Sequence, residues 1–344
     1  MKEYGSDFHY ILASDFFQVR LNQFKDKQFY ADGRQAIQHL VVFRKWERIW
    51  MPEYFCYEIV NAIKETGVEV VFYPDAPGLN DDDLVKNIPF RKNDVILRMN
   101  YFGMRSRRDN SKVPVEVIED HSHDLIGDWS TKSNADWCIA SLRKTLPIPE
   151  GGMLWSPKKH EMPVSPLQTD ENNKLTSKRW DAMKLKMEYI DKGIGDKETF
   201  RRMYIETEED FEKLPVSDLT SECKEYLRYF DVKRWTNVKN ENWRQLSKIK
   251  SDGIQILYPE NPDCNMFSFV FLLESEQLRN RVKTYLINNN LYPVVLWNLR
   301  EEITGHASEF SKRMVSIPCD GRYNADDMTV MKEILTQAIV SSEK

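Results

Sequence analysis

The chain has 344 residues, of which 41% are hydrophobic and 30% are charged, so its composition is that of a globular enzyme and not of a disordered or fibrous protein. Its 49 Lys and Arg against 54 Asp and Glu give a formal charge of −5, which provides no electrostatic reason to bind nucleic acid. The length predicts two packed domains or one large domain with an appendage, because single hydrophobic cores rarely grow beyond roughly 250–300 residues.

Short apolar runs alternate with amphipathic stretches in the first part of the chain. The expected strands cover residues 48–51, 68–73, 94–100, 115–119 and 136–140, and the expected helices cover 34–43, 57–66 and 82–86. This alternation predicts a mostly parallel sheet with helices on both faces. Ligands of such sheets bind beyond the carboxyl ends of the strands, where Asp120 and Ser141 fall.

The character of the sequence changes after residue 156. Charged, long-period sequence from about 157 to 240, including a run from Phe211 to Tyr229, predicts helices that bridge two domains. A mixture of strands and helices follows, which predicts a compact second domain. We therefore expect a large domain over residues 1–240 and a small C-terminal domain over residues 241–344.

The most informative feature is a lysine that follows a carboxylate. Lys144 lies in a Ser-x-x-Lys segment that begins at Ser141 and leads to the turn Gly151-Gly152, and Asp120 precedes it at the end of a predicted strand. An enzyme that holds pyridoxal phosphate needs these groups, because the lysine forms an imine and the carboxylate sets the electronics of the ring. Taken singly, the lysine fits a solvated loop and the aspartate a strand-end cap.

These segments together resemble the fold type I pyridoxal-phosphate enzymes, and within them the DegT/DnrJ/EryC1/StrS group of sugar aminotransferases. The resemblance covers most of residues 28–156, returns in the last hundred residues, and rests on the order and spacing of the motifs. It implies an α/β fold like that of aspartate aminotransferase. Such a fold is a three-layer sandwich with a mainly parallel mixed sheet, plus a smaller C-terminal α/β domain.

The resemblance also implies roles for individual residues. Lys144 would carry the cofactor as an aldimine and move the proton, Asp120 would face the pyridine nitrogen, and His123 would lie near the phenolic oxygen. The opening of the helix after Gly33 would bind the phosphate, since free amides and the helix dipole favour anions there. The residues expected to bind the cofactor are Gly33, Arg34, Gln35, Tyr54, Phe55, Asp120, His123, Ser141 and Lys144.

The chain departs from the family pattern at several of these positions. Ser141 stands three residues before the lysine, where the sugar aminotransferases usually place a serine five residues before it. Arg34 replaces the helix-opening hydroxyl residue, and Cys56 stands where an aromatic ring often stacks, which leaves that role to Tyr54 or Phe55.

The resemblance implies an aminotransferase that moves an amino group from an amino acid, with glutamate as the expected donor, to a keto sugar or a similar polar acceptor. The family's substrate segment has become residues 291–297, which leaves open whether the acceptor is a nucleotide sugar. Two alternatives remain: a lyase or dehydratase on the same scaffold, and a catalytically silent sensor or scaffold. We expect a homodimer, because the family builds its site from two chains, with Asn237, Asn240 and Asn242 as candidates to cross the interface.

Other features narrow the setting. The His-x-His segment between Asp120 and Asp124 suggests a metal site, but no third or fourth ligand is evident, so we expect no metal. Five scattered cysteines without a Cys-x-x-Cys pair fit a reducing compartment. Without an apolar signal segment or membrane span, we expect a cytoplasmic protein with no membrane partner.

Overall fold

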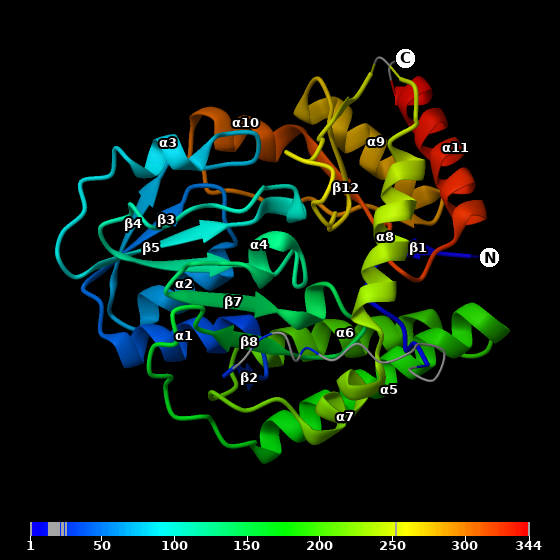
Figure 1. The fold of residues 1–344 in the computed structure, drawn as a ribbon. Coiled ribbons are helices and arrows are strands. Elements are labelled where there is room, and N and C mark those ends of the chain that lie inside the picture. Colours follow the sequence, from blue (N-terminus) through cyan, green and yellow to red (C-terminus); the bar gives the residue numbers. More distant parts are fainter. Residues whose placement is uncertain (1, 13–20, 22–23, 25, 252, 343–344) are drawn as a thin grey trace.

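The computed structural model describes residues 2–12, 21, 24, 26–251 and 253–342. A seven-stranded sheet forms the centre, and β8 runs antiparallel to both of its neighbours while the strands from β7 across to β4 are parallel (Figure 1). The predicted fold class, with a mainly parallel mixed sheet, is thereby confirmed. In spatial order the strands are β2 (Gln28–Tyr30), β8 (Gly152–Trp155), β7 (Trp137–Ser141), β6 (Glu116–Asp120), β5 (Asp94–Met99), β3 (Arg48–Pro52) and β4 (Glu69–Tyr73).

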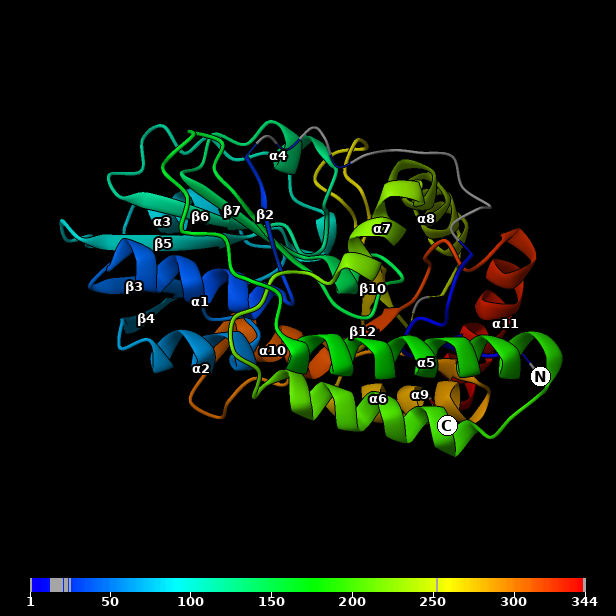
Figure 2. The same cartoon turned by 90° about the horizontal axis from the view of Figure 1, so that it is seen from below.

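The central strands are apolar on both faces because both faces are covered. In β5 and β6, Ile96 and Val117 belong to one buried cluster, whereas Leu97 and Ile118 belong to the other. Helices α1 (Gly33–Arg44) and α2 (Tyr57–Glu65) lie along one face of the sheet (Figure 2). The cluster of the opposite face includes side chains from later helices, between residues 170 and 246.

Those later helices correct one expectation. The stretch from Phe211 to Tyr229, for which helical structure was expected, is helical only from Ser221 onward, because one helix ends at Phe211 and the next begins at Ser221, after a segment that contains Pro215. Thr220 accepts a hydrogen bond from a backbone amide of the new helix and so fixes its start. The helices that follow α2 are α3 (Asp81–Val85), α4 (Asp128–Thr131), α5 (Asp170–Lys192), α6 (Lys197–Phe211), α7 (Ser221–Tyr229) and α8 (Val232–Leu246), with 3-10 turns at Tyr101–Gly103 and Leu142–Lys144.

A three-stranded antiparallel sheet and three helices form the C-terminal part. The N-terminal strand β1 (Tyr4–Gly5) pairs in parallel with β11, so the start of the chain lies against the C-terminal part, beside α11 (Figure 1). The remaining elements are β9 (Gln255–Ile256), β10 (Phe269–Leu272), α9 (Glu276–Asn288), β11 (Leu291–Tyr292), α10 (Gly305–Arg313), β12 (Met314–Ile317) and α11 (Ala325–Ser342). Within the described ranges, none of the helices has the length and apolar character needed to span a bilayer.

Candidate active site

The carboxyl ends of β6 and β7 bring two predicted site residues to one edge of the sheet. Asp120 is the last residue of β6 and Ser141 the last of β7, and these strands are parallel neighbours. The backbone amide of Ser141 donates to Oγ of Ser122 at 2.8 Å, and the amide of His121 donates to a β7 carbonyl at 2.8 Å. The loops after the two strands are therefore fixed against each other.

The Gly-Gly turn holds the lysine loop near the start of α1. The amide of Leu142 donates to the carbonyl of Gly151 at 2.8 Å, and Gly151 has a φ of 133°, which favours glycine. A Cβ at Gly152 would lie 2.1 Å from the carbonyl oxygen of Asp32. Only glycine therefore allows β8, the turn that carries Lys144 and the start of α1 to approach this closely.

Two adjoining cavities meet at Lys144. The smaller cavity, of about 70 Å³, lies over the sheet edge, and the larger cavity, of about 440 Å³, extends toward the C-terminal part. Lys144 is half-buried and lines both, with Nζ 5.7 Å from the centre of the Trp297 ring. The smaller cavity is lined by Gly33, Arg34, Phe55, Asp120, Ser122 and Ser141 among others, and the larger by Phe8, His123, Lys239, Phe267, Ser268 and Ser316 among others.

His123 presents an unsatisfied donor to this region. Its Nδ1 accepts the backbone amide of Phe102 at 2.9 Å, so the neutral ring carries its proton on Nε2, which is buried without a partner among the described residues. The ring stacks on Phe267 with centroids 4.3 Å apart. Burial first, and then the ammonium groups of Lys144 and Lys239, hold the pKa of His123 well below its usual value. His123 is therefore a neutral N–H donor.

Asp120 keeps one oxygen available. Its Oδ1 accepts the backbone amide of Ser122 at 2.8 Å, which fixes the carboxylate at the edge of the smaller cavity. Its Oδ2 makes no hydrogen bond within the part of the chain that the structure describes. The free oxygen is thus an acceptor for a protonated ligand atom.

Positively and negatively charged side chains lie together at the start of α1. The carboxylate of Asp32 caps the helix by accepting the amide of Gln35 at 2.7 Å, and it also accepts the guanidinium of Arg34 at 3.1 Å. Arg143 forms two hydrogen bonds with Glu208, at 2.6 and 3.0 Å. Burial alone would raise the pKa of Glu208, but its arginine partners lower it to about 2. The cationic side chains at this end are therefore already paired with carboxylates.

Two of the predicted cofactor-binding residues, Gln35 and Tyr54, line neither cavity. The Gln35 side chain donates to the carbonyl of Pro215 at 3.0 Å and accepts the amide of Ser217 at 2.9 Å, so it holds a loop and lines neither cavity. Tyr54 is fully buried against neighbouring rings and also lines neither cavity. Phe55 does line the smaller cavity. The proposed cofactor roles of Gln35 and Tyr54 thus gain no support from their placement.

The candidate interface asparagines are placed differently from one another. Asn240 donates to Oδ1 of Asn265 at 2.8 Å and accepts the amide of Met266 at 2.9 Å. Asn242 donates to three backbone carbonyls of residues 319–323, while Asn237 is exposed. Asn240 and Asn242 therefore join α8 to the C-terminal part within one chain.

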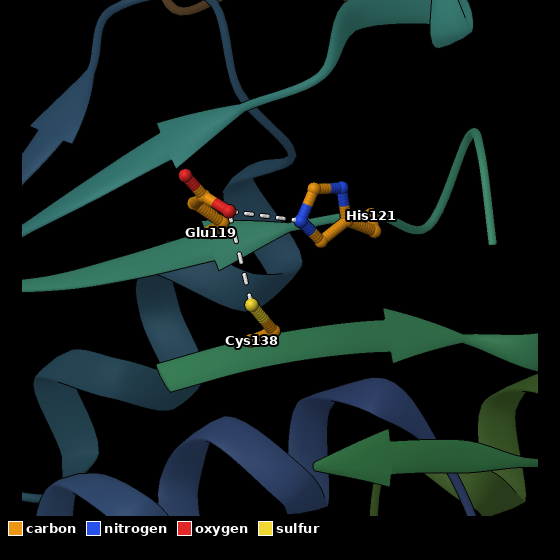
Figure 3. Close-up of side chains that lie close together, drawn as sticks. All are labelled: Glu119, His121 and Cys138. Carbon is orange, nitrogen blue, oxygen red and sulfur yellow. Dashed lines mark hydrogen bonds and ion pairs between the residues drawn. The ribbon is translucent and has the colours of Figure 1, made fainter. Parts of the chain in front are cut away.

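A second cluster of polar side chains comes from β6, the residue that follows it and β7 (Figure 3). Ligand-type atoms of Glu119, His121 and Cys138 lie within 4.8 Å of one another, and Nε2 of His121 is 3.1 Å from Oε2 of Glu119. The Glu119 carboxylate also accepts Asn110 at 2.7 Å and Ser133 at 2.6 Å. Because hydrogen bonds already occupy this carboxylate, and burial raises the pKa of the Cys138 thiol, the cluster serves to join β6 to its neighbours.

Lys239 lies on α8 and lines the larger cavity, although it was not among the predicted site residues. A signal was present, because Lys239 falls on the buried stripe of the helix, between Trp235 and Trp243. A lysine in phase with apolar residues indicates a buried ammonium group. The contribution of Phe8, in the N-terminal segment, had no such signal.

Comparison with solved structures places the fold. Spr1654 of Streptococcus pneumoniae, which is assigned as a sugar aminotransferase and was solved in its PLP form, matches with a TM-score of 0.65 at 11% identity, over 99% of each chain. PseC of Helicobacter pylori, an aminotransferase of pseudoaminic acid biosynthesis, matches with a TM-score of 0.62 at 13% identity, over 99% of this chain and 100% of PseC. A DegT DnrJ EryC1 StrS aminotransferase from Brucella abortus matches with a TM-score of 0.60 at 12% identity, over 92% and 86%. No protein-family model and no curated sequence matches the chain. The chain therefore has the fold of these aminotransferases.

Proposed function

We propose that this chain is a pyridoxal-phosphate-dependent aminotransferase of the DegT/DnrJ/EryC1/StrS type. One observation carries the proposal: Lys144 lines two adjoining cavities at the carboxyl edge of the sheet, of which Asp120 lines the smaller and His123 the larger. Asp120 offers a free oxygen and His123 an Nε2–H that has no partner among the described residues. This edge is where open α/β sheets bind their ligands. The fold shared with solved sugar aminotransferases supports the same conclusion.

The unsatisfied groups fit the cofactor. Bound pyridoxal phosphate would supply an aldehyde that exchanges an amino group and a ring that withdraws electrons. Asp120 would keep the proton on the ring nitrogen, because a nearby carboxylate favours the charged form. Nε2–H of His123 would donate to the phenolic oxygen. The phosphate would take the start of α1, with the Arg34 guanidinium and the Ser141 hydroxyl as donors.

Lys144 has the reactive position in this scheme. It lines both cavities, so its amine lies between the proposed cofactor side and the open space for a substrate. It would attach the cofactor and then move a proton at the substrate carbon that exchanges the amino group. The aromatic side chains of Phe267 and Trp297 form apolar walls that exclude water from this proton transfer.

The larger cavity suits a small substrate. Its volume of about 440 Å³ lies in the usual range of small-molecule sites, roughly 300–1,000 Å³. We propose an amino acid, glutamate first, as the donor and a keto sugar or similar polar ketone as the acceptor. A cytoplasmic homodimer belongs to the same proposal, on the basis of the family resemblance.

Cofactor attachment provides the first test. Purified protein mixed with pyridoxal phosphate should turn yellow, and borohydride should then fix the cofactor to the peptide that contains Lys144, as read by mass spectrometry. Lys144→Ala should lose the covalent label and at least about 10²–10⁴-fold of any amino-transfer rate. Lys112→Ala, which removes an exposed loop lysine, is the matched control and should behave as wild type.

The outcome separates the alternatives. A colourless protein that takes up no cofactor would end the proposal. Labelling of Lys144 without conversion by any amino acid would favour a silent sensor or scaffold. Release of water or of a leaving group from a sugar substrate, without amino transfer, would favour a lyase or dehydratase.

A further inference from the structure

Lys239 is a buried lysine that pairs with no other residue in the part of the chain that the structure describes. It lies in the middle of α8, is only 4% exposed, and lines the larger cavity. Among the described residues its ammonium group forms no hydrogen bond and no ion pair. Charged groups are rarely buried in this way unless something pairs with them.

The acidic side chains near Lys239 are bound by other donors. Oδ1 of Asp124 accepts the amide of Gly127 at 2.9 Å and the side chain of Asn265 at 3.2 Å. Both oxygens of Asp320 accept the guanidinium of Arg322, each at 2.8 Å. These carboxylates attract Lys239 from a distance without contacting it.

The surroundings of Lys239 favour a small monoanion. Burial lowers the pKa of Lys239, and the carboxylates of Asp124 and Asp320 oppose that shift. The same carboxylates would repel a dianionic phosphate more strongly than a singly charged carboxylate. Ser316 donates its hydroxyl to Oγ of Ser268 at 2.6 Å, which leaves the Ser268 hydroxyl free to donate to an anion in the cavity.

The position of Lys239 matches the shape of an amino acid. Lys144, Lys239 and His123 all line the larger cavity, and both ammonium groups lower the pKa of His123. In an α-amino acid the carboxylate is one bond from the carbon that carries the amino group. A substrate whose reacting carbon lies at Lys144 therefore places its carboxylate close by.

We propose that Lys239 anchors the carboxylate of the amino-acid donor and of its keto-acid product in the larger cavity. This inference rests on the proposed function, because it assigns the donor's binding group in the same site. Lys239 is then a specificity residue, which selects donors that carry a carboxylate over simple amines.

Binding of 2-oxoglutarate to the full-length protein tests the inference, with and without added pyridoxal phosphate. Lys239→Met should weaken 2-oxoglutarate binding at least tenfold by calorimetry and leave binding of its uncharged dimethyl ester unchanged. Lys233→Met, which removes an exposed lysine from the same helix, should bind 2-oxoglutarate as wild type does. Equal affinity of wild type and Lys239→Met for 2-oxoglutarate would overturn the inference.

Two further measurements separate this inference from the proposed function. If the protein takes up no pyridoxal phosphate, the proposed function fails, while the effect of Lys239→Met is still measured on the cofactor-free protein. If Lys239→Met does not fold, chemical acetylation of the lysines of wild type, with and without 2-oxoglutarate, tests the inference instead. 2-Oxoglutarate should protect the Lys239 peptide and not the Lys233 peptide, and an absence of protection at Lys239 would contradict the inference.

Discussion

Two buried groups of charge in this molecule differ in how they are satisfied. Around Asp81, Arg98 donates to one carboxylate oxygen at 2.8 Å and Arg108 to the other at 2.6 Å, while Arg105 forms two hydrogen bonds with Asp75. Every charge in this first group meets an opposite charge. In the second group, around the larger cavity, Lys239 and Nε2 of His123 lack partners within the described part of the chain.

The difference distinguishes a structural role from a binding role. A paired buried charge holds chain segments together, and Arg108 also reaches Glu260, at 2.7 Å, which ties the large sheet to the C-terminal part. An unpaired buried charged or polar group lowers the free energy of unfolding, and this loss is offset only when a ligand pairs with the group. The first group therefore stabilises the fold, and the second is available to the proposed ligands.

The largest expected effect comes from breaking the first group. Burial would raise the pKa of Asp81, but its arginine partners lower it to about 2, so the carboxylate is ionised at neutral pH. Asp81→Asn should cost about 3–5 kcal/mol of unfolding free energy, because it leaves buried guanidinium groups without their counter-charge. Denaturant unfolding gives the measurement.

Two control variants are compared with Asp81→Asn. Asp83→Asn removes an exposed carboxylate of the same helix and should cost less than about 1 kcal/mol. Lys239→Met, in the second group, should cause no loss of stability in the cofactor-free protein. A stability loss for Lys239→Met equal to that of Asp81→Asn would remove the distinction between the two groups.

A smaller effect concerns pH and His123. Burial and the ammonium groups of Lys144 and Lys239 hold the pKa of His123 well below its usual value. On acidification the His123 ring is therefore protonated in the unfolded chain while it stays neutral in the folded chain. Its contribution to stability is thus complete above about pH 6.5 and is lost below it, by up to about 1.4 kcal/mol per pH unit.

Denaturant unfolding at pH 7 and pH 5 checks this expectation. Wild type should lose more unfolding free energy on acidification than His123→Gln, which cannot titrate. The exposed control His306→Gln should follow wild type. If wild type and His123→Gln show the same pH dependence, His123 is protonated in the folded state and the assigned neutral donor is wrong.

The smallest effect concerns Asp32, which brings a negative charge to the proposed phosphate end. Asp32→Asn keeps a helix cap, since asparagine also accepts the amide of Gln35, but it removes the repulsion. The affinity for pyridoxal phosphate, measured by fluorescence titration, should rise about threefold, in line with roughly 0.3–1 kcal/mol for a charge at a helix terminus. Asp196→Asn changes the analogous cap of α6 and should have no effect. Weaker binding by Asp32→Asn would place the phosphate elsewhere.

The sequence predicted the parts of the site that depend on local pattern. Asp120 and Ser141 end apolar runs that could only be buried strands, and parallel strands bring their carboxyl ends to one edge. Gly152 lies at a contact that excludes a Cβ, which is why the Gly-Gly turn was informative. The position of Lys144 could be predicted because it lies between the end of the strand at Ser141 and this turn.

The parts that depend on tertiary contacts could not be predicted in the same way. Gln35 follows Gly33 in the helix opening, yet its side chain is drawn to the loop around Pro215, far along the chain. Tyr54 packs against rings from three other segments, so local sequence could not place it. The burial of Lys239 can be inferred from its place on α8, but sequence order does not reveal that this helix lines the larger cavity.

The N-terminal strand has a consequence for biosynthesis. The amide of Gly5 donates to Oη of Tyr323, which lies 318 positions later, and Gly5 also lines the larger cavity. At about 5–20 residues per second, a ribosome needs roughly 15–60 seconds between these residues. The first segment must therefore wait until Tyr323 has been synthesised before it can form this hydrogen bond, and the cavity wall that it contributes is completed only after that point.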